Sequence, residues 1–374
     1  MIHLLLTLLF SPLLRLFAGR APAQPARVLV IQLAKIGDLL CSTPVFRELK
    51  RCYPAVELSV LATKINAPLL RCNPRVDHVV EADARQFRGL AGKWRLIALL
   101  RRGRYDTVIC LNAGAAYATA ALWAGIPRRL AVLSNFGETT HHLAARLWTG
   151  VERHRGDRLI QATYLALLEK LGIRDGSIAK EIFPAPGAAE KVAALLGANI
   201  GPLLGIGVSS ANRLKALGSE KIIDLARGML SAYPGLSVVL IGGPEDAQQA
   251  DEIRQALASE RVIDFCGKLG LAELPALLEK LSTYLGVDSG VTYMADAVGI
   301  PVVSVAGPCN MAETRPTGKR VVIIQRAELP CQPCAHIFKA PYSCWVGTRA
   351  CIVDVSAAEI AAAVSSLLSV GEKL

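Results

Sequence analysis

The stretch LGVDSGVTYMADAVGIPVVSVAGP (285–308) contains a complete strand–helix–strand pattern. An apolar run ends at Asp288, a helical stretch follows Gly290, and Gly299-Ile300-Pro301 separates that stretch from a second apolar run. The predicted elements are a strand (283–288), a helix (291–298) and a strand (301–307). Strands joined through a helix predict a parallel α/β sheet, and the amides at the start of the helix predict an anion site.

The same alternation of apolar runs and helical stretches extends over both halves of the 374-residue chain. In the first half the predicted strands are 27–33, 56–63, 78–83, 107–113 and 130–134, with a helix at 93–102. In the second half they are 203–209, 236–243 and 261–267, with helices at 219–232, 245–258 and 271–281. The composition is 52% hydrophobic but only 5% aromatic, which suits buried parallel strands covered by helices. We therefore expect two Rossmann-like domains with parallel sheets.

The segment FPAPG (183–187), with two prolines and a glycine, is the best candidate for the boundary between the domains. The expected division is an apolar N-terminal segment (1–25), a first Rossmann-like domain (26–185), a second Rossmann-like domain (186–355) and a C-terminal helix (356–374).

The N-terminal residues 2–18, IHLLLTLLFSPLLRLFA, form a short apolar run. They lack the positive start of a signal peptide, and Pro12 and Arg15 interrupt the run. The run is also shorter than a transmembrane helix requires. We expect a helix lying in the membrane interface; a helix packed on the protein's own surface and a cleaved signal peptide are the alternatives.

Excess positive charge lies entirely in the first half of the chain. Residues 1–187 hold 26 Lys and Arg against 13 Asp and Glu, whereas residues 188–374 hold 16 against 18. Seven of these cations fall within twenty residues: Arg85, Arg88, Lys93, Arg95, Arg101, Arg102 and Arg104. Such a field indicates an anionic partner. Because aromatic residues are not interleaved with the basic ones, as they are in single-strand binders, nucleic acid is disfavoured.

Ten cysteines are scattered along the chain, which favours a reducing compartment. The last four, Cys331, Cys334, Cys344 and Cys351, follow a C-x2-C-x9-C-x6-C pattern. That spacing is within the range of structural zinc sites, although the second pair is unlike that of a zinc ribbon. A metal site is left open, and disulfides are the lesser alternative.

Ligands of open α/β sheets bind beyond the carboxyl ends of strands, so the residues that follow each apolar run are the candidate site residues. In the first half, Lys35 and Asp38 follow strand 27–33. From spacing alone, the favoured interpretation of Asp38 is a charge that interacts with the dipole of the following helix.

In the second half, Ser209 and Ser210 lie at the end of strand 203–209, and Lys215 lies in the loop before the next helix. Hydroxyls and an ammonium group are what a leaving diphosphate requires. Glu245 follows a Gly-Gly turn, where a carboxylate can accept hydrogen bonds from a ribose. Surface-loop roles and helix capping are the alternatives for these residues.

Five stretches, in their order along the chain, resemble glycosyltransferase family 9, the family of lipopolysaccharide heptosyltransferases. They are AKIGDLLCSTPVFRELKRCYP, the lysine loop, the GG-P-E turn, GKLGLAELPALL (267–278) and GVDSGVTYMADAVGIPVVSVAGP. The resemblance implies a GT-B architecture with two facing domains, an inverting transfer without a catalytic metal, and no cofactor besides a nucleotide-sugar co-substrate, expected to be ADP-heptose. It places the donor in the C-terminal domain and the acceptor in the N-terminal domain.

By position, the resemblance implies Asp38 as the general base and Lys215 as the diphosphate contact. It also implies Ser209 and Ser210 as diphosphate contacts and Asp288-Ser289-Gly290 as the donor loop. The whole donor-binding set expected is Ser209, Ser210, Glu245, Lys268, Asp288, Ser289, Gly290 and Tyr293, and the basic charge of the first half makes Lys35, Arg101, Arg102 and Arg104 the expected acceptor-binding residues. Family members usually show D-T/S-G-P-x-H, where this chain has Val291 and Tyr293 in place of Pro and His. A phenol can donate a hydrogen bond but carries no charge near neutral pH.

The function expected is transfer of a sugar, a heptose by resemblance, to a lipopolysaccharide core or related anionic glycolipid at the inner face of the cytoplasmic membrane. A sugar-nucleotide epimerase of the same architecture and a non-enzymatic membrane-surface binding protein are the alternatives, since fold alone does not decide function.

Overall fold

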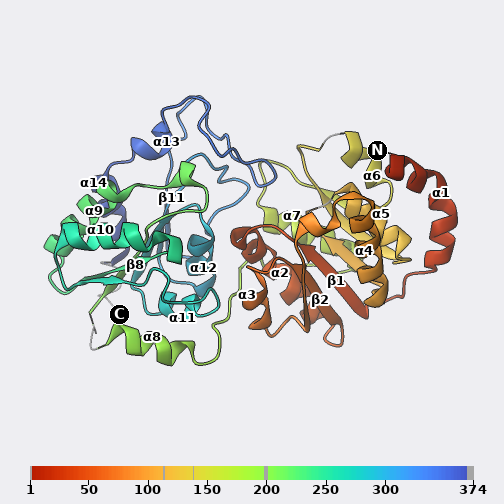
Figure 1. The fold of residues 1–374 in the computed structure, drawn as a ribbon, viewed down its shortest axis with the longest axis horizontal. Coiled ribbons are helices and arrows are strands. Elements are labelled where there is room, and N and C mark those ends of the chain that lie inside the picture. Colours follow the sequence, from red (N-terminus) through yellow and green to blue (C-terminus); the bar gives the residue numbers. More distant parts are fainter. Residues whose placement is uncertain (1, 113, 138, 198–200, 369–374) are drawn as a thin grey trace. The chain divides into compact units, whose positions relative to one another are not determined.

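The computed structural model describes residues 2–112, 114–137, 139–197 and 201–368. The chain divides into two compact units, Met1–Lys180 and Glu181–Leu374 (Figure 1). The division falls just before the predicted boundary segment 183–187. Each unit is built on one six-stranded sheet whose paired strands are all parallel. The predicted fold class, two Rossmann-like halves, is confirmed.

In unit 1 the sheet has the order β3-β2-β1-β4-β5-β6. The strands are β1 (Arg27–Gln32), β2 (Glu57–Ala62), β3 (His78–Glu81), β4 (Thr107–Cys110), β5 (Arg128–Leu133) and β6 (Gly150–Arg153). The sequence pattern did not predict β6, a half-exposed edge strand without an apolar run. Since the chain order reverses between β1 and β4, the carboxyl ends of these two strands form the switch point of the sheet.

The helices of unit 1 form two groups that pack among themselves. They are α1 (Ile2–Ala18), α2 (Ile36–Cys52), α3 (Ala67–Arg71), α4 (Gly89–Arg102), α5 (Ala115–Trp123), α6 (Thr139–Ala145) and α7 (Ile160–Leu168), with short 3-10 turns η1 (Ala84–Phe87) and η2 (Glu169–Leu171). α5 packs against α1, α4 and α6, whereas α2 packs against α7. Apolar side chains of α4 and α5 and of the central strands form one continuous core.

In unit 2 the sheet has the order β12-β11-β10-β7-β8-β9, so the switch point lies between β7 and β10. The strands are β7 (Leu203–Gly207), β8 (Ser237–Ile241), β9 (Val262–Asp264), β10 (Thr283–Val287), β11 (Val302–Val305) and β12 (Val321–Ile324). The helices are α8 (Ala188–Leu196), α9 (Ser219–Ala232), α10 (Ala247–Leu257), α11 (Leu274–Leu278), α12 (Gly290–Val298), α13 (Ala350–Val353) and α14 (Ala357–Leu368), with η3 (Arg213–Lys215) and η4 (Pro244–Asp246). The predicted helix 356–374 corresponds to α14, and its residues 369–374 lie outside the described part of the chain.

The apolar N-terminal segment forms helix α1, which packs on α5 and α6. Leu4 is buried in the core of unit 1. The indole Nε1 of Trp123 donates a hydrogen bond of 3.0 Å to Thr7, and the guanidinium of Arg15 donates one of 2.7 Å to the carbonyl of Arg146. None of the described helices combines the length and the apolar character needed to cross a membrane. One face of α1 is therefore held by the protein itself.

Candidate functional site

The candidate residues of unit 2 meet at the switch point between β7 and β10. These strands are neighbours in the middle of the sheet. Lys215 follows β7, and Asp288 follows β10 directly. Because the carboxyl ends of parallel strands lie at one edge of a sheet, the fold brings together two residues that are far apart in the sequence.

A short turn positions Lys215. Asn212 is buried, accepts a hydrogen bond from the amide of Leu214 (3.2 Å) and donates one to the carbonyl of Pro341 (2.9 Å). These contacts fix the 3-10 turn η3, which ends at Lys215. Lys215 therefore lies at the end of a hydrogen-bonded turn within the loop that the sequence predicted, and Ser209 and Ser210 lie in the segment leading to it.

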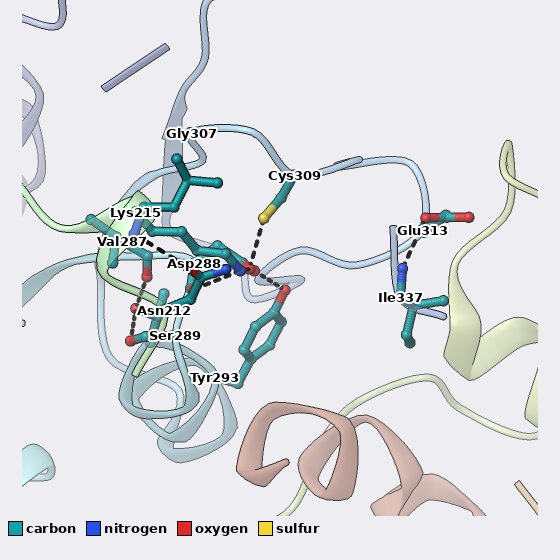
Figure 2. Close-up of polar contacts among 12 residues, drawn as sticks. Asn212, Lys215, Val287, Asp288, Ser289, Tyr293, Gly307, Cys309, Glu313 and Ile337 are labelled. Atoms are coloured by element: carbon teal, nitrogen blue, oxygen red, sulfur yellow. Dashed lines mark hydrogen bonds and ion pairs between the residues drawn. The ribbon is translucent and has the colours of Figure 1, made fainter. Parts of the chain in front are cut away.

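The Asp288 carboxylate accepts hydrogen bonds from three different side chains (Figure 2). The ammonium group of Lys215 pairs with it, the Tyr293 hydroxyl donates a hydrogen bond of 2.7 Å, and the Cys309 thiol donates one of 3.0 Å. Lys215 also donates to the carbonyl of Asp288 at 3.3 Å. The side chains of Lys215 and Asp288 are only 13% and 12% exposed. This is a nearly dry, hydrogen-bonded ion pair.

The surroundings keep both members of this pair charged. Burial alone would lower the pKa of Lys215, but the negative charge of Asp288 outweighs it and raises that pKa. Burial alone would raise the pKa of Asp288, but Lys215 together with the hydrogen bonds lowers it. Burial and the Asp288 charge raise the pKa of the Cys309 thiol well above its usual value. The thiol stays protonated near neutral pH and serves as a donor.

The N-terminus of α12 begins next to this pair. Ser289 is the N-cap residue and Gly290 is the first residue of the nine-residue helix. The Ser289 hydroxyl lies 3.2 Å from that of Thr292, which donates to the carbonyl of Val287. First-turn amides have no acceptor within their own helix, so they can bind an anion. A lysine and a helix N-terminus at one switch point suit a diphosphate.

Two other predicted donor residues lie farther along the same edge of the sheet. Glu245, in turn η4 after β8, is exposed, and its neighbour Asp246 accepts the amide of Gly243 at 2.8 Å. Lys268 is exposed beyond β9 and donates to the carbonyl of Asp264 at 2.6 Å. The structure does not join either residue to the Lys215–Asp288 pair, and their roles stay predictions.

In unit 1, Asp38 lies in the first turn of α2, at the switch point beyond β1. Its carboxylate accepts the amide of Lys35 at 3.2 Å, and its carbonyl accepts the amide group of Gln32 at 3.3 Å. The fully buried Tyr164 lies close enough that, after burial itself, the Asp38 charge raises its pKa. Asp38 thus lies at the start of a helix, as the alternative interpretation of the sequence expected. Its role as a base stays a prediction.

The three arginines predicted to bind the acceptor lie elsewhere in unit 1. Arg101 and Arg102 end α4, and Arg104 follows in the turn before β4. Arg101 donates to the carbonyl of Trp123, at the end of α5. Since α4 and α5 end where the next strands begin, these arginines lie at the amino edge of the sheet, opposite Asp38. The sequence grouped them with Lys35 by charge, and the structure does not bring them together.

Sequence reasoning missed Cys309 and Asn212. Cys309 follows β11, the strand next to β10, so the rule of examining the residues beyond each strand applies to it. Paired spacing, the usual sequence signal of a functional cysteine, does not apply to this single thiol. Asn212 has no signal besides its place beside the serine pair.

The four cysteines of the tail lie near one another in unit 2. All four thiols are free of disulfide bonds. Within the described residues, no group of three or more His, Cys, Asp or Glu side chains is placed to hold a metal ion. After burial itself, the charges of Cys331, Cys334 and Cys344 nevertheless act on the pKa of Cys351, so the four thiols lie near one another, and the zinc interpretation of the spacing stays a prediction.

We expect Tyr293→Phe to lower the free energy of unfolding by about 1.5–3 kcal/mol, since it removes a hydrogen bond to a buried charged group. Urea denaturation measures the change. The matched control is Tyr342→Phe at an exposed position, where we expect less than about 0.5 kcal/mol. Equal small effects for both variants would mean that the Tyr293 hydroxyl does not support Asp288.

Two parallel-sheet units of this kind are the architecture of the GT-B class, to which glycosyltransferases belong. The model of glycosyltransferase family 9 (heptosyltransferase) matches residues 93–342. The chain belongs to this family, and it is a glycosyltransferase; the resemblance inferred from the sequence motifs is confirmed.

Named relatives agree with this assignment. Lipopolysaccharide heptosyltransferase 3 of Escherichia coli K12 is 26% identical over 312 residues, which cover 80% of this chain and 88% of the relative. The solved structure of E. coli ADP-heptose LPS heptosyltransferase II is 20% identical, with a TM-score of 0.72 over 92% of this chain and 99% of that one. E. coli heptosyltransferase WaaC with ADP-2-deoxy-2-fluoro heptose is 17% identical, with a TM-score of 0.66 over 91% and 99%. The structural likenesses show the shared fold.

Proposed function

We propose that this chain transfers a heptose from ADP-heptose, with inversion, to a lipopolysaccharide core or related glycolipid acceptor. The observation that carries the proposal is the buried Lys215–Asp288 pair beside the N-terminus of α12, at the switch point of the unit 2 sheet. Relatives named as lipopolysaccharide heptosyltransferases, and a relative with an ADP-heptose analogue bound, support the choice of sugar and nucleotide.

The role proposed for unit 2 is to hold the donor diphosphate. As the bond from the sugar to the diphosphate breaks, negative charge grows on the leaving oxygen. Lys215, the hydroxyls of Ser209 and Ser210, and the amides around Gly290 stabilise that charge. Asp288 keeps the ammonium in place and protonated, so Lys215 acts as a charge and not as a proton donor. Glu245 and Lys268 are proposed contacts to the nucleoside part.

The role proposed for unit 1 is to activate the acceptor. The Asp38 carboxylate takes the proton of an acceptor hydroxyl while that oxygen attacks the anomeric carbon from the face opposite the diphosphate. The carbon–oxygen bond to the diphosphate breaks, and the leaving group takes the electron pair. One displacement of this kind inverts the anomeric configuration. General-base catalysis contributes about 10²–10⁴-fold.

We propose residues 26–185 as the acceptor domain and 186–355 as the donor domain, acting without a metal ion or cofactor. The basic first half suits a phosphorylated glycolipid in an anionic leaflet. The proposed location is the cytoplasmic face of the inner membrane, where the protein is peripheral.

Nucleotide binding and release test the proposal. In a thermal-shift titration ADP should stabilise the protein more than UDP or GDP. ADP should be released from ADP-heptose only when a core acceptor is present, and a chelator should leave the rate unchanged. Loss of activity with the chelator, restored by a metal, would contradict the metal-independent part. Conversion of the donor sugar without ADP release would indicate an epimerase.

A further inference from the structure

Helix α1 carries apolar side chains both on the side that packs against unit 1 and on the opposite, exposed side. Leu4 and Thr7 face the protein and are buried against it. The opposite side carries seven large apolar residues that are between 46% and 79% exposed: Leu5, Leu6, Leu9, Phe10, Leu13, Leu16 and Phe17. A helix that covers its own protein normally turns charged and polar side chains outward. An exposed apolar face of this size marks an interaction surface.

Helix α4, in the same group of helices, carries two further exposed apolar residues. Trp94 and Leu90 are 58% and 57% exposed. The Trp94 ring lies 6.2 Å, centroid to centroid, from the ring of Trp123, whose indole in turn donates to Thr7 of α1. Exposed tryptophan next to an apolar helix is typical of the boundary between lipid and water.

The four helices of this group carry charges of one sign only. Helices α1, α4, α5 and α6, which pack together, contain no Asp or Glu. The cations on α1 and α4 are Arg15, Lys93, Arg95, Arg101 and Arg102. By contrast α2, in the other group of helices, carries Asp38 and Glu48. Because this group of four helices has no acidic side chain, it is complementary to an anionic surface.

We propose that the exposed side of α1, with Leu90 and Trp94, inserts into the headgroup layer of an anionic bilayer. The helix lies in the plane of the interface, held to unit 1 by its inner side, and the cations of α4 contact lipid phosphates. Arg101 and Arg102, which the structure places away from Asp38, thereby gain a role in membrane binding. The proposal rests on the proposed function, because an acceptor carried in a membrane is the reason why the enzyme needs such a surface.

The test is flotation of the full chain with vesicles of equal parts phosphatidylglycerol and phosphatidylcholine, compared with pure phosphatidylcholine. The variant carries Leu9→Gln, Leu16→Gln and Phe17→Gln. We expect its partition coefficient onto anionic vesicles to fall at least about tenfold, because three inserting apolar side chains are lost. Its melting temperature should match that of the unaltered protein, since these side chains are exposed. Binding of the unaltered protein should weaken in pure phosphatidylcholine and at high salt.

The control carries Ile65→Gln, Leu195→Gln and Val353→Gln, three exposed apolar positions outside this surface, and should bind vesicles like the unaltered protein. Activity on a soluble acceptor should be the same for all three proteins, whereas activity on a vesicle-embedded acceptor should fall only in the α1 variant. Unchanged vesicle binding of the α1 variant would overturn the proposal. So would a vesicle-inert dimer that this variant converts to monomers, because a second copy would then cover the surface. Failure of every protein on the soluble acceptor would instead refute the proposed function.

Discussion

Replacing Asp38 with Asn should lower turnover at least about a hundredfold while leaving the affinity for the donor nearly unchanged. Asparagine keeps the size of the side chain and its oxygen near the Lys35 amide, but it cannot take a proton. A base acts only in the transition state, so its loss lowers kcat and not donor binding. Measurements are the initial rate at saturating donor and acceptor, and a calorimetric titration with ADP.

The control for this prediction is Asp83→Asn. Asp83 also accepts an amide at the start of a turn in unit 1, from Arg85 at 2.8 Å. If Asp38 only interacts with the helix dipole, both variants lose about 0.3–1 kcal/mol of stability and keep their activity. Turnover of Asp38→Asn equal to that of the unaltered enzyme would exclude the base role.

Replacing Lys215 with Met should lower the free energy of unfolding by about 3–5 kcal/mol, because the change leaves the Asp288 carboxylate buried without its cation. ADP binding should also become much weaker, since the ammonium group is the proposed contact to the diphosphate. Urea denaturation and calorimetry measure the two effects. If ADP affinity is unaltered, Lys215 has no part in donor binding.

A second variant separates folding from binding. Lys215→Met combined with Asp288→Asn leaves neither charge buried, so it should recover most of the stability but none of the ADP affinity. The lowered pKa of Asp288 means that the stability contributed by the pair is lost as the pH falls through that pKa. The raised pKa of Lys215 means that it is lost as the pH rises through that one. Between about pH 5 and 9 the difference from the unaltered protein should therefore stay constant.

Much of the fold could be predicted from the sequence because buried parallel strands are continuous apolar runs. Strand β10 and helix α12 lie within a residue of their predicted bounds. The edge strand β6 was not predicted because it has no apolar run, and β12, the apolar run VVII, was not among the predicted strands. Pairing with a neighbouring strand, which local sequence does not reveal, holds them in the sheet.

The candidate site could also be predicted only in part. Lys215 and Asp288 were found because each follows a central strand, and topology then brings them together. Tyr293 was predicted as a donor contact, but its hydrogen bond to Asp288 depends on the geometry of a helical turn. Charge clustering did not predict where Arg101, Arg102 and Arg104 lie, since a run of cations does not reveal which edge of the sheet it occupies, and their role in acceptor binding stays a prediction.

The most direct test is to identify the product formed from ADP-heptose and a soluble core oligosaccharide. Mass spectrometry of the acceptor, quantitation of ADP and the anomeric configuration by NMR are read from one reaction. We expect the acceptor to gain one heptose for each ADP released, with the configuration opposite to that in the donor. Retention of configuration, transfer of a different sugar only, or conversion of the donor with no change in the acceptor would contradict the assignment of this chain as an inverting heptosyltransferase.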